Sequence, residues 1–273
     1  MGMCVYKLRG GAILHINSIS CGQGAPSLYL IVMAGQGQFP ADVVITADTG
    51  WENDCLWSTG ERTTAKEFWD AVTQPLAEEF GMAAAWVRAN DGEGNPLPPL
   101  QDTQAILPNG KVSIDIPMYG SKGGKLSQSC TSKYKVAAMR QELRRRGART
   151  ATSHLGLTMD EVGRMKTNDV KWETKAWPLI ERKLYRTNAV AELERMSIPY
   201  LITSECDGCP HKDWPRWKRT SPAMIESLGE WESNIDGFFL TRNLIPLSQS
   251  LAKMELGEAM DMFEPCDDGY CFV

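Results

Sequence analysis

The sequence lacks several features that would point to particular classes of protein. It has no run of roughly 18 consecutive apolar residues, the length that a membrane-spanning helix needs. Its first residues, MGMCVYKLRGG, contain no long apolar segment, and Tyr6 stands where a myristoylation signal has Ser or Thr. No internal repeat or low-complexity tract is present. We therefore expect a cytoplasmic protein with no membrane partner.

An excess of positive charge is also missing. The 273 residues include 29 Lys and Arg against 34 Asp and Glu, which gives a formal net charge of −5. No overall basic field attracts nucleic acid, so any anion site must be local. Apolar residues make up 42% and charged residues 23%, as in globular chains with a real core. Disorder, collagen and coiled coil are therefore excluded.

The first half of the chain alternates strand-like and helix-like segments. Strands are predicted at residues 12–18, 42–47, 83–88 and 153–157, and helices at residues 28–35, 64–80 and 132–147. Thr64 and Glu67 form a capping-box pattern at the start of the second helix, and Pro75 predicts a kink or a break inside it. This order predicts an α/β fold: a Rossmann-like open parallel sheet with helices on both faces.

The remaining segments differ in character. Residues 90–125, rich in Gly and Pro, are expected to form a long loop of the kind that compact domains keep for function. We expect an α/β domain over residues 1–200 and a small cysteine- and tryptophan-bearing subdomain over residues 201–273. The tryptophans of that subdomain are expected to form its core in preference to stacking on bases: Trp214, Trp217 and Trp231.

Two turns follow predicted strands at their carboxyl ends, where open parallel sheets bind ligands. The first, SCGQGAPS at residues 20–27, places Gly22 and Gly24 before a helix N-terminus, which suits an anion. A tight turn without a ligand is an equal alternative for this turn alone. The second, ADTGWEND at residues 47–54, supplies carboxylates typical of Mg²⁺ or ribose binding, or of a solvated acidic loop: Asp48, Glu52 and Asp54.

Four segments in this order resemble the phosphoadenosine-phosphosulfate (PAPS) reductase-like proteins of the adenine nucleotide α-hydrolase, or PP-loop, superfamily. They are SCGQGAPS, ADTGWE, SCTSKYK and GLTMDEVGRMK, and the resemblance runs from about Asn17 to the C-terminus. It implies an adenine nucleotide ligand. The phosphates would lie against Ser20, Gly22, Gly24 and Ser27, the adenosine beside Asp48, Thr49 and Gly50, and the phosphate tail near Lys133, Lys135, Asp160, Glu161 and Arg164.

Two departures from the family pattern bear on the reaction. The usual PP-loop, SGGKDS, contains Lys and Asp, whereas Gln23, Ala25 and Pro26 stand in this loop. The Glu-Cys-Gly-Leu-His run that carries the nucleophile of PAPS reductases is missing from the sequence EPCDDGYCFV at the C-terminus. We therefore expect an ATP α-hydrolase (pyrophosphatase) that uses ATP with Mg²⁺, with Asp48, Lys133 and Arg164 as catalytic residues, and with sulfur transfer as an option.

Two alternatives remain for the function. The first is a sulfonucleotide reductase, which needs a reactive thiol and an external dithiol. The second is a nucleotide-binding accessory module without catalysis, whose partner is a nucleic acid or a nucleoprotein complex. The oligomeric state is open, a homodimer being one option.

Cysteine pairs indicate a sulfur site. Cys206 and Cys209 form a C-x-x-C pattern, and Cys266 and Cys271 form a second pair. Two such pairs are typical of zinc or of a 4Fe–4S cluster, and metal-free buried thiols are the alternative. The resemblance to cluster-bearing reductases adds Cys130, but a serine stands where those enzymes carry a further cysteine. One tail cysteine would then be the fourth ligand.

A cluster of basic residues lies between Lys133 and Arg149. It fits a cradle for polyphosphate or nucleic acid, or a solvated helix face whose cations favour the helix C-terminus. We favour the solvated face for residues 144–149. Lys133 and Lys135 are expected to face the ligand, because the resembling motif contains them.

Overall fold

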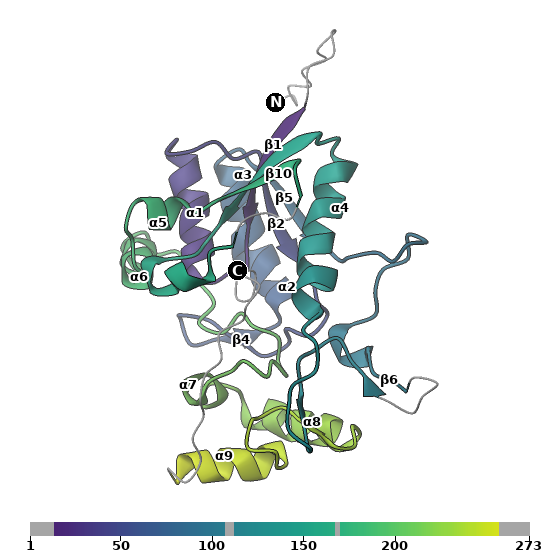
Figure 1. Ribbon diagram of the computed structural model, residues 1–273. Coiled ribbons are helices and arrows are strands. Elements are labelled where there is room, and N and C mark those ends of the chain that lie inside the picture. The colour runs from purple at the N-terminus through teal and green to yellow at the C-terminus, as the bar shows by residue number, and fades with distance from the viewer. Residues whose placement is uncertain (1–13, 107–111, 167–169, 257–273) are drawn as a thin grey trace.

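The computed structural model describes residues 14–106, 112–166 and 170–256. Five parallel strands form its central sheet, in the spatial order β10–β9–β1–β2–β5 (Figure 1). Their bounds are His15–Ser20 (β1), Val43–Ala47 (β2), Ala83–Val87 (β5), Thr150–Leu155 (β9) and Glu173–Ala176 (β10). The expected α/β fold with an open parallel sheet is confirmed.

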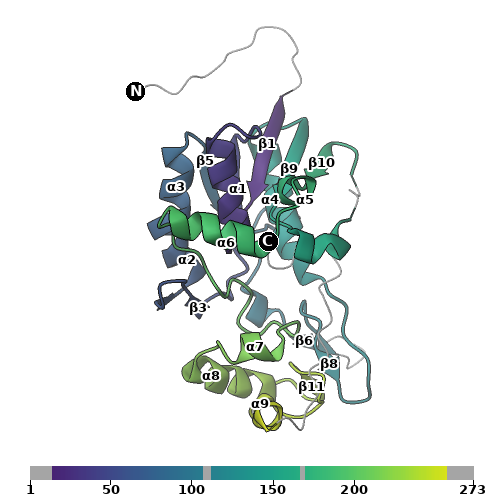
Figure 2. The same cartoon turned by 90° about the vertical axis from the view of Figure 1, so that its left-hand side faces the viewer.

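Helices cover both faces of the sheet. Helices α1, α3 and α6 lie on one face and α4 lies on the other (Figures 1 and 2). The helices of the described chain are α1 (Ala25–Gly35), α2 (Ala65–Phe68), α3 (Gln74–Glu79), α4 (Ala137–Arg145), α5 (Pro178–Glu181), α6 (Arg186–Arg195), α7 (Trp214–Trp217), α8 (Pro222–Ser233) and α9 (Leu247–Glu255).

Local sequence explains these elements well. Helix α1 is apolar almost all round because it is enclosed by the sheet, α3 and α6, and residues Leu28 and Leu30 are fully buried. The Thr64–Glu67 capping box is confirmed at the start of α2. The helical backbone does not break at Pro75: a π-helical segment, Trp69–Thr73, joins α2 to α3, and Pro75 lies in the first turn of α3.

A second lobe lies beyond the sheet and contains α7, α8, α9 and the short strand β11 (Phe238–Phe239) (Figure 2). Its core includes Trp217 and Leu228, with Trp214 and Trp231 packed against it, so the expected role of these tryptophans is confirmed. The same core also takes residues from the first 200: Trp51, Leu100, Ile114, Ile116, Met118 and Tyr134. The long loop therefore covers this lobe, which the sequence did not predict.

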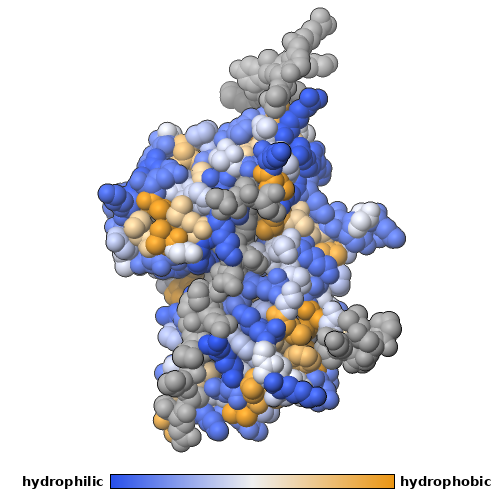
Figure 3. All heavy atoms as spheres, in the orientation of Figure 1, coloured by the Kyte–Doolittle hydropathy of each residue, from blue (hydrophilic) through white to orange (hydrophobic). Residues whose placement is uncertain are grey.

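Short strands lie in the segments that connect the main elements. They are β3 (Cys55–Leu56), β4 (Arg62–Thr63), β6 (Ala105–Ile106), β7 (Val112–Ser113) and β8 (Tyr119–Gly120). Strand β8 pairs with β11 and so ties the long loop to the second lobe. The visible face is mostly hydrophilic, with small apolar groups between the charged side chains (Figure 3). Within the described ranges, none of the helices combines the length and apolarity that crossing a membrane requires.

Candidate functional site

The predicted phosphate turn joins the end of β1 to the start of α1. Gly24 is the N-cap residue of α1, and no side chain caps this end of the helix. Gln23 adopts a left-handed backbone conformation, with φ of 64°. Its buried amide donates to the Ala65 carbonyl oxygen (3.0 Å) and accepts from the Thr73 hydroxyl (3.1 Å). These bonds hold a conformation that a non-glycine residue rarely adopts, and they occupy the Gln23 side chain.

A recess opens beside this turn, at the carboxyl ends of three neighbouring strands. The space inside it that a water molecule can enter is about 20 Å³, so the recess is narrow. Its walls come from the turn, from the ends of β2 and β5, and from the segment that leads into α4: Ser20, Cys21, Gly22, Gln23, Thr46, Ala47, Glu52, Ala65, Trp86, Lys135, Met139 and Ser204. The turn thus borders a recess, which we call the nucleotide recess after the ligand that the sequence predicts for it.

Hydrogen bonds of Ser27 and Gly24 stabilise the turn. The buried Ser27 hydroxyl donates to the Gly24 carbonyl oxygen (3.0 Å) and accepts from the Cys21 thiol (3.7 Å). Gly156, in the GLTMDEVGRMK segment, packs against Ser27 so closely that a Cβ would lie 2.9 Å from the Ser27 amide nitrogen. The segment after β9 is therefore in direct contact with the start of α1.

The carboxylates of the second turn are engaged in contacts within the protein. Asp48 forms an ion pair with Arg88 (2.6 Å) and accepts from the Gly50 amide. Glu52 Oε1 accepts from the Thr49 hydroxyl (2.6 Å) and from the Cys206 thiol (3.2 Å). Of these carboxylates, only Glu52 lines the nucleotide recess.

The two lysines of the SCTSKYK segment have different surroundings. Lys133 is half exposed and pairs with Asp115 at 2.7 Å, outside the lining of the nucleotide recess. Lys135 lines that recess. Burial opposes its charge, but Cys206, Glu52 and two further thiols outweigh burial and raise the pKa of Lys135. Lys135 therefore lies near the Glu52 carboxylate and near thiols that favour its ammonium form once they ionise.

The acidic segment after β9 does not line the nucleotide recess. Arg164 forms an ion pair with Glu161, and burial lowers the pKa of Arg164 despite this pairing. Arg186 lies 3.8 Å from Glu161. Asp160 accepts from the Thr158 hydroxyl (3.1 Å) and from the Arg186 amide (2.7 Å). The structure thus places these residues in a separate ion-pair group.

Three predicted metal-ligating cysteines meet at a second recess, which we call the thiol recess. Cys130, Cys206 and Cys209 line it together with Glu205 and with mainly apolar neighbours: Leu100, Ile116, Pro117, Thr131, Pro210 and His211. Lys135 is part of this lining as well, so it borders both recesses. Cys266 and Cys271 lie outside the described residues.

The thiols of this recess are protonated when no metal is bound. Burial raises the pKa of Cys130 to about 11 and raises the pKa of Cys206 and Cys209 as well. Metal binding requires the thiolate form, so these thiols must lose protons to act as ligands. The buried Lys135 ammonium would favour that loss because its positive charge faces them.

The donor set around the thiol recess consists of three cysteine thiols and one carboxylate. Among the described residues, no three His, Cys, Asp or Glu side chains converge closely enough to hold one metal ion. An iron–sulfur cluster is several atoms across and takes its cysteine ligands at separate corners, as thiols around a shared recess can supply. The Glu205 carboxylate oxygen Oε1 in this lining is buried and has no hydrogen-bond partner.

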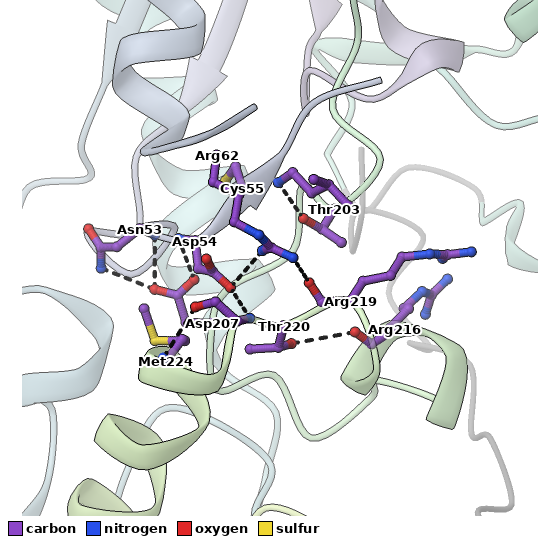
Figure 4. A network of polar contacts seen from close by, with 12 residues as sticks. Asn53, Asp54, Cys55, Arg62, Thr203, Asp207, Arg216, Arg219, Thr220 and Met224 are labelled. Carbon is purple, nitrogen blue, oxygen red and sulfur yellow. Dashed lines mark hydrogen bonds and ion pairs between the residues drawn. The ribbon is translucent and has the colours of Figure 1, made fainter. Parts of the chain in front are cut away.

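The loop after β2 holds the C-x-x-C turn in place (Figure 4). The Asp207 carboxylate accepts from the backbone amides of Asn53 (2.9 Å) and Asp54 (3.1 Å). Asp54 pairs with Arg62 (3.0 Å) and accepts from the Ser221 amide (2.7 Å). These hydrogen bonds and the ion pair therefore link the loop after β2, at the sheet, to the C-x-x-C turn and to the start of α8 in the second lobe.

The basic stretch on α4 makes contacts within the protein. Arg145 and Arg146 pair with Glu142, at 2.6 and 2.7 Å. Arg140 pairs with Glu173 (2.7 Å), and the Arg144 guanidinium lies 3.8 Å from the ring centre of Trp172. Arg144, Arg145 and Arg149 are exposed and Arg146 is half-buried, which agrees with the expected solvated helix face over residues 144–149.

Sequence reasoning missed several residues of the two recesses. Thr46, Trp86, Ser204 and Met139 line the nucleotide recess, and Glu205 lines the thiol recess. Thr46 and Trp86 could have been predicted as lining residues, because both lie near the carboxyl ends of predicted parallel strands. Ser204 and Glu205 directly precede the first cysteine of the C-x-x-C pattern, but nothing local indicates which way they face.

Comparisons with known proteins give limited information. No protein-family model and no curated protein matches the chain. Among solved structures, the chain is similar to a phosphoadenylyl-sulfate (PAPS) reductase from Candida auris in a phosphate complex. The two are 10% identical, the match covers 67% of this chain and 74% of that chain, and the TM-score is 0.36. The fold assignment therefore rests on the sheet and helices described above.

Proposed function

We propose that the protein is a sulfonucleotide reductase: it binds an adenine nucleotide that carries a sulfate group and reduces that sulfate to sulfite. The position of Lys135 carries this proposal, because Lys135 borders both recesses. An ammonium group there would hold the anionic end of a nucleotide on one side and face sulfur ligands on the other.

The nucleotide recess supports the binding step. It lies at the carboxyl ends of parallel strands, beside the uncapped N-terminus of α1, where amide dipoles favour an anion. The Trp86 side chain in its wall offers a flat apolar surface to a base. The predicted ligands Ser20 and Gly22 line the recess, whereas Lys133 and Arg164 do not.

The reduction requires a thiolate nucleophile. Its sulfur would attack the sulfate sulfur, form an S–S bond and break the bond from sulfur to the nucleotide oxygen, so that adenylyl sulfate releases AMP and PAPS releases adenosine 3′,5′-bisphosphate. A second thiol would then release sulfite and leave a disulfide, which an external dithiol reduces. Burial raises the pKa of Cys21 to about 11 and raises that of Cys55 and of the recess thiols, so we assign the nucleophile to the pair near the C-terminus, Cys266 or Cys271, in preference to the lone Cys4.

We further propose that Cys130, Cys206 and Cys209 hold an iron–sulfur cluster. When bound, such a cluster supplies a charged, polarisable centre close to the sulfur that is reduced. Lys135 would neutralise part of the negative charge of its thiolate ligands. Zinc stays a prediction that requires ligands beyond the described residues.

ATP hydrolysis also stays a prediction, and the site geometry favours it less. The carboxylates expected to hold Mg²⁺ are engaged elsewhere: Asp48 pairs with Arg88, Asp54 pairs with Arg62, and Glu52 bonds Thr49 and Cys206. A role as a nucleic-acid accessory module is likewise untested.

The test is a product analysis under anaerobic conditions. The protein is incubated with PAPS or with adenylyl sulfate and dithiothreitol, and sulfite and nucleotide are quantified. We expect sulfite in equal amounts with the nucleotide product, which is AMP from adenylyl sulfate and adenosine 3′,5′-bisphosphate from PAPS, and loss of both in Cys266→Ser or Cys271→Ser. Absence of sulfite with both substrates contradicts the proposal, and release of AMP and pyrophosphate from ATP with Mg²⁺ would favour the ATP α-hydrolase instead.

A further inference from the structure

A buried carboxylate at the thiol recess has no role in the contacts described so far. The Glu205 residue is only 7% exposed, and its side chain lines the recess next to Cys206 and Cys209. Its Oε2 accepts a hydrogen bond from the Ser204 amide (3.2 Å), but its Oε1 has no hydrogen-bond partner. Burying a carboxylate oxygen without a hydrogen-bond donor is unfavourable, so such an oxygen calls for an explanation.

Neighbouring groups do not supply the missing partner. The His211 Nε2 lies 3.0 Å from the Gln128 side-chain oxygen. The Lys212 ammonium donates to the Asp207 carbonyl oxygen (2.8 Å) and to the Thr220 hydroxyl (3.2 Å). The electrostatic contribution of Glu205 to the raised pKa of Cys209 indicates that its charge lies close to that thiol. The orphaned oxygen and the thiols therefore share one space.

We infer that Glu205 is the fourth ligand of the iron–sulfur cluster proposed above, so that the cluster has three thiolate corners and one carboxylate corner. The inference rests on that proposed cluster, and it replaces a tail cysteine in this role. A carboxylate oxygen is a harder ligand than thiolate and binds iron well in protein sites. The iron at the Glu205 corner should therefore be the one that is lost first.

The test uses the full chain, reconstituted anaerobically with ferrous iron and sulfide. Iron and acid-labile sulfide are measured per chain, and electron paramagnetic resonance (EPR) is recorded after mild oxidation. We expect about four irons in the wild type and in the Cys266→Ser/Cys271→Ser double variant. Glu205→Gln should fall to about three irons and give the signal of an oxidised three-iron cluster. Glu205→Cys should restore four irons and should slow iron loss to a chelator at least tenfold relative to the wild type.

Three results would overturn the inference. The first is that Glu205→Gln keeps the iron content and the EPR spectrum of the wild type. The buried Glu205 oxygen would then be a hydrogen-bond partner of a water molecule and not an iron ligand. The second is loss of iron in the double serine variant, which would assign the corner to the tail. The third is a wild type that takes up no iron. Glu226→Gln, an exposed carboxylate on α8, controls for a change of charge alone.

The inference and the proposed reductase can fail independently. Nucleotide binding and sulfite release are measured without any reference to Glu205. A protein that releases sulfite but holds four irons in Glu205→Gln refutes the inference alone. A protein that loses one iron in Glu205→Gln but releases no sulfite refutes the reductase alone. Circular dichroism shows whether Glu205→Gln folds. If it does not fold, the iron content of Glu205→Cys and of the double serine variant still tests the inference.

Discussion

The Trp51 ring packs directly on Gly208, so that a Cβ at position 208 would lie 2.2 Å from the Trp51 ring carbon Cη2. Trp51 belongs to the loop after β2, and Gly208 lies inside the C-x-x-C turn. The Trp51 carbonyl oxygen also accepts from the Asp207 amide (2.7 Å). This contact fixes the thiol recess against the sheet that carries the nucleotide recess.

Gly208→Ala should therefore destabilise the protein. The added methyl group must displace the Trp51 ring, and overpacking of this kind costs about 1–3 kcal/mol. The free energy of unfolding, measured by urea denaturation, should fall by that amount. Gly229→Ala is the matched control, because Gly229 lies within α8 and a Cβ there meets nothing within 4 Å. The control should be neutral or gain up to about 1 kcal/mol; equal losses in both variants would contradict the packing account.

Lys135→Met should weaken nucleotide binding while Lys133→Met should not. Lys135 lines the nucleotide recess, whereas Lys133 pairs with Asp115 outside it. Loss of one charge-assisted hydrogen bond, about 1.5–3 kcal/mol, corresponds to roughly 10- to 150-fold in affinity. Calorimetry with PAPS measures both variants, and the Lys133 variant should stay within about threefold of the wild type. A larger loss in Lys133→Met than in Lys135→Met would show that the wrong lysine has been assigned.

Glu142→Gln should lower stability at neutral pH and have little effect in acid. Burial opposes ionisation of Glu142, but hydrogen bonds from Arg145 and Arg146 outweigh it and hold the pKa below its ordinary value. A carboxyl with a lowered pKa stabilises the fold above its unfolded pKa of about 4.3, and this contribution is lost as pH falls through the folded value. The variant should lose about 1–3 kcal/mol at pH 7. A difference from the wild type that persists unchanged at pH 3 would contradict this assignment.

Cys21 and Cys130 should react slowly with iodoacetamide in the folded, metal-free protein. Burial raises the pKa of each thiol to about 11, so that at pH 8 only about one in a thousand is a thiolate. An unfolded thiol with a pKa of about 8.5 is roughly one quarter ionised at that pH. Peptide mass spectrometry should show alkylation at least about 100-fold slower in native protein than in urea. Comparable rates in the two states would mean that these thiols are not buried.

Much of the fold follows from the sequence because its signals are local. The apolar run over Leu28–Met33, the capping box at Thr64 and the strand at residues 43–47 each depend on near neighbours, and each is observed. The site is harder, because its contacts join distant segments. No local pattern shows that the Gln23 amide turns inward to Thr73, or that Trp51 packs on Gly208.

The two lysines illustrate the same limit. Lys133 and Lys135 are only two residues apart in a segment with π-helical geometry over Thr131–Val136, and only the backbone path decides which one enters the recess. The resembling motif marks both equally. Likewise, the acidic residues after β2 suggest a metal site by composition, but their arginine and hydroxyl partners come from other parts of the chain.

The most direct test is isothermal titration calorimetry of the full chain with PAPS, adenylyl sulfate, ATP and AMP. The recess beside Gly22 and Lys135 predicts saturable binding at one site per chain for at least one sulfonucleotide, weaker binding of AMP, and loss of heat in Lys135→Met. Flat traces for all four nucleotides, or binding that Lys135→Met leaves unchanged, would contradict the account.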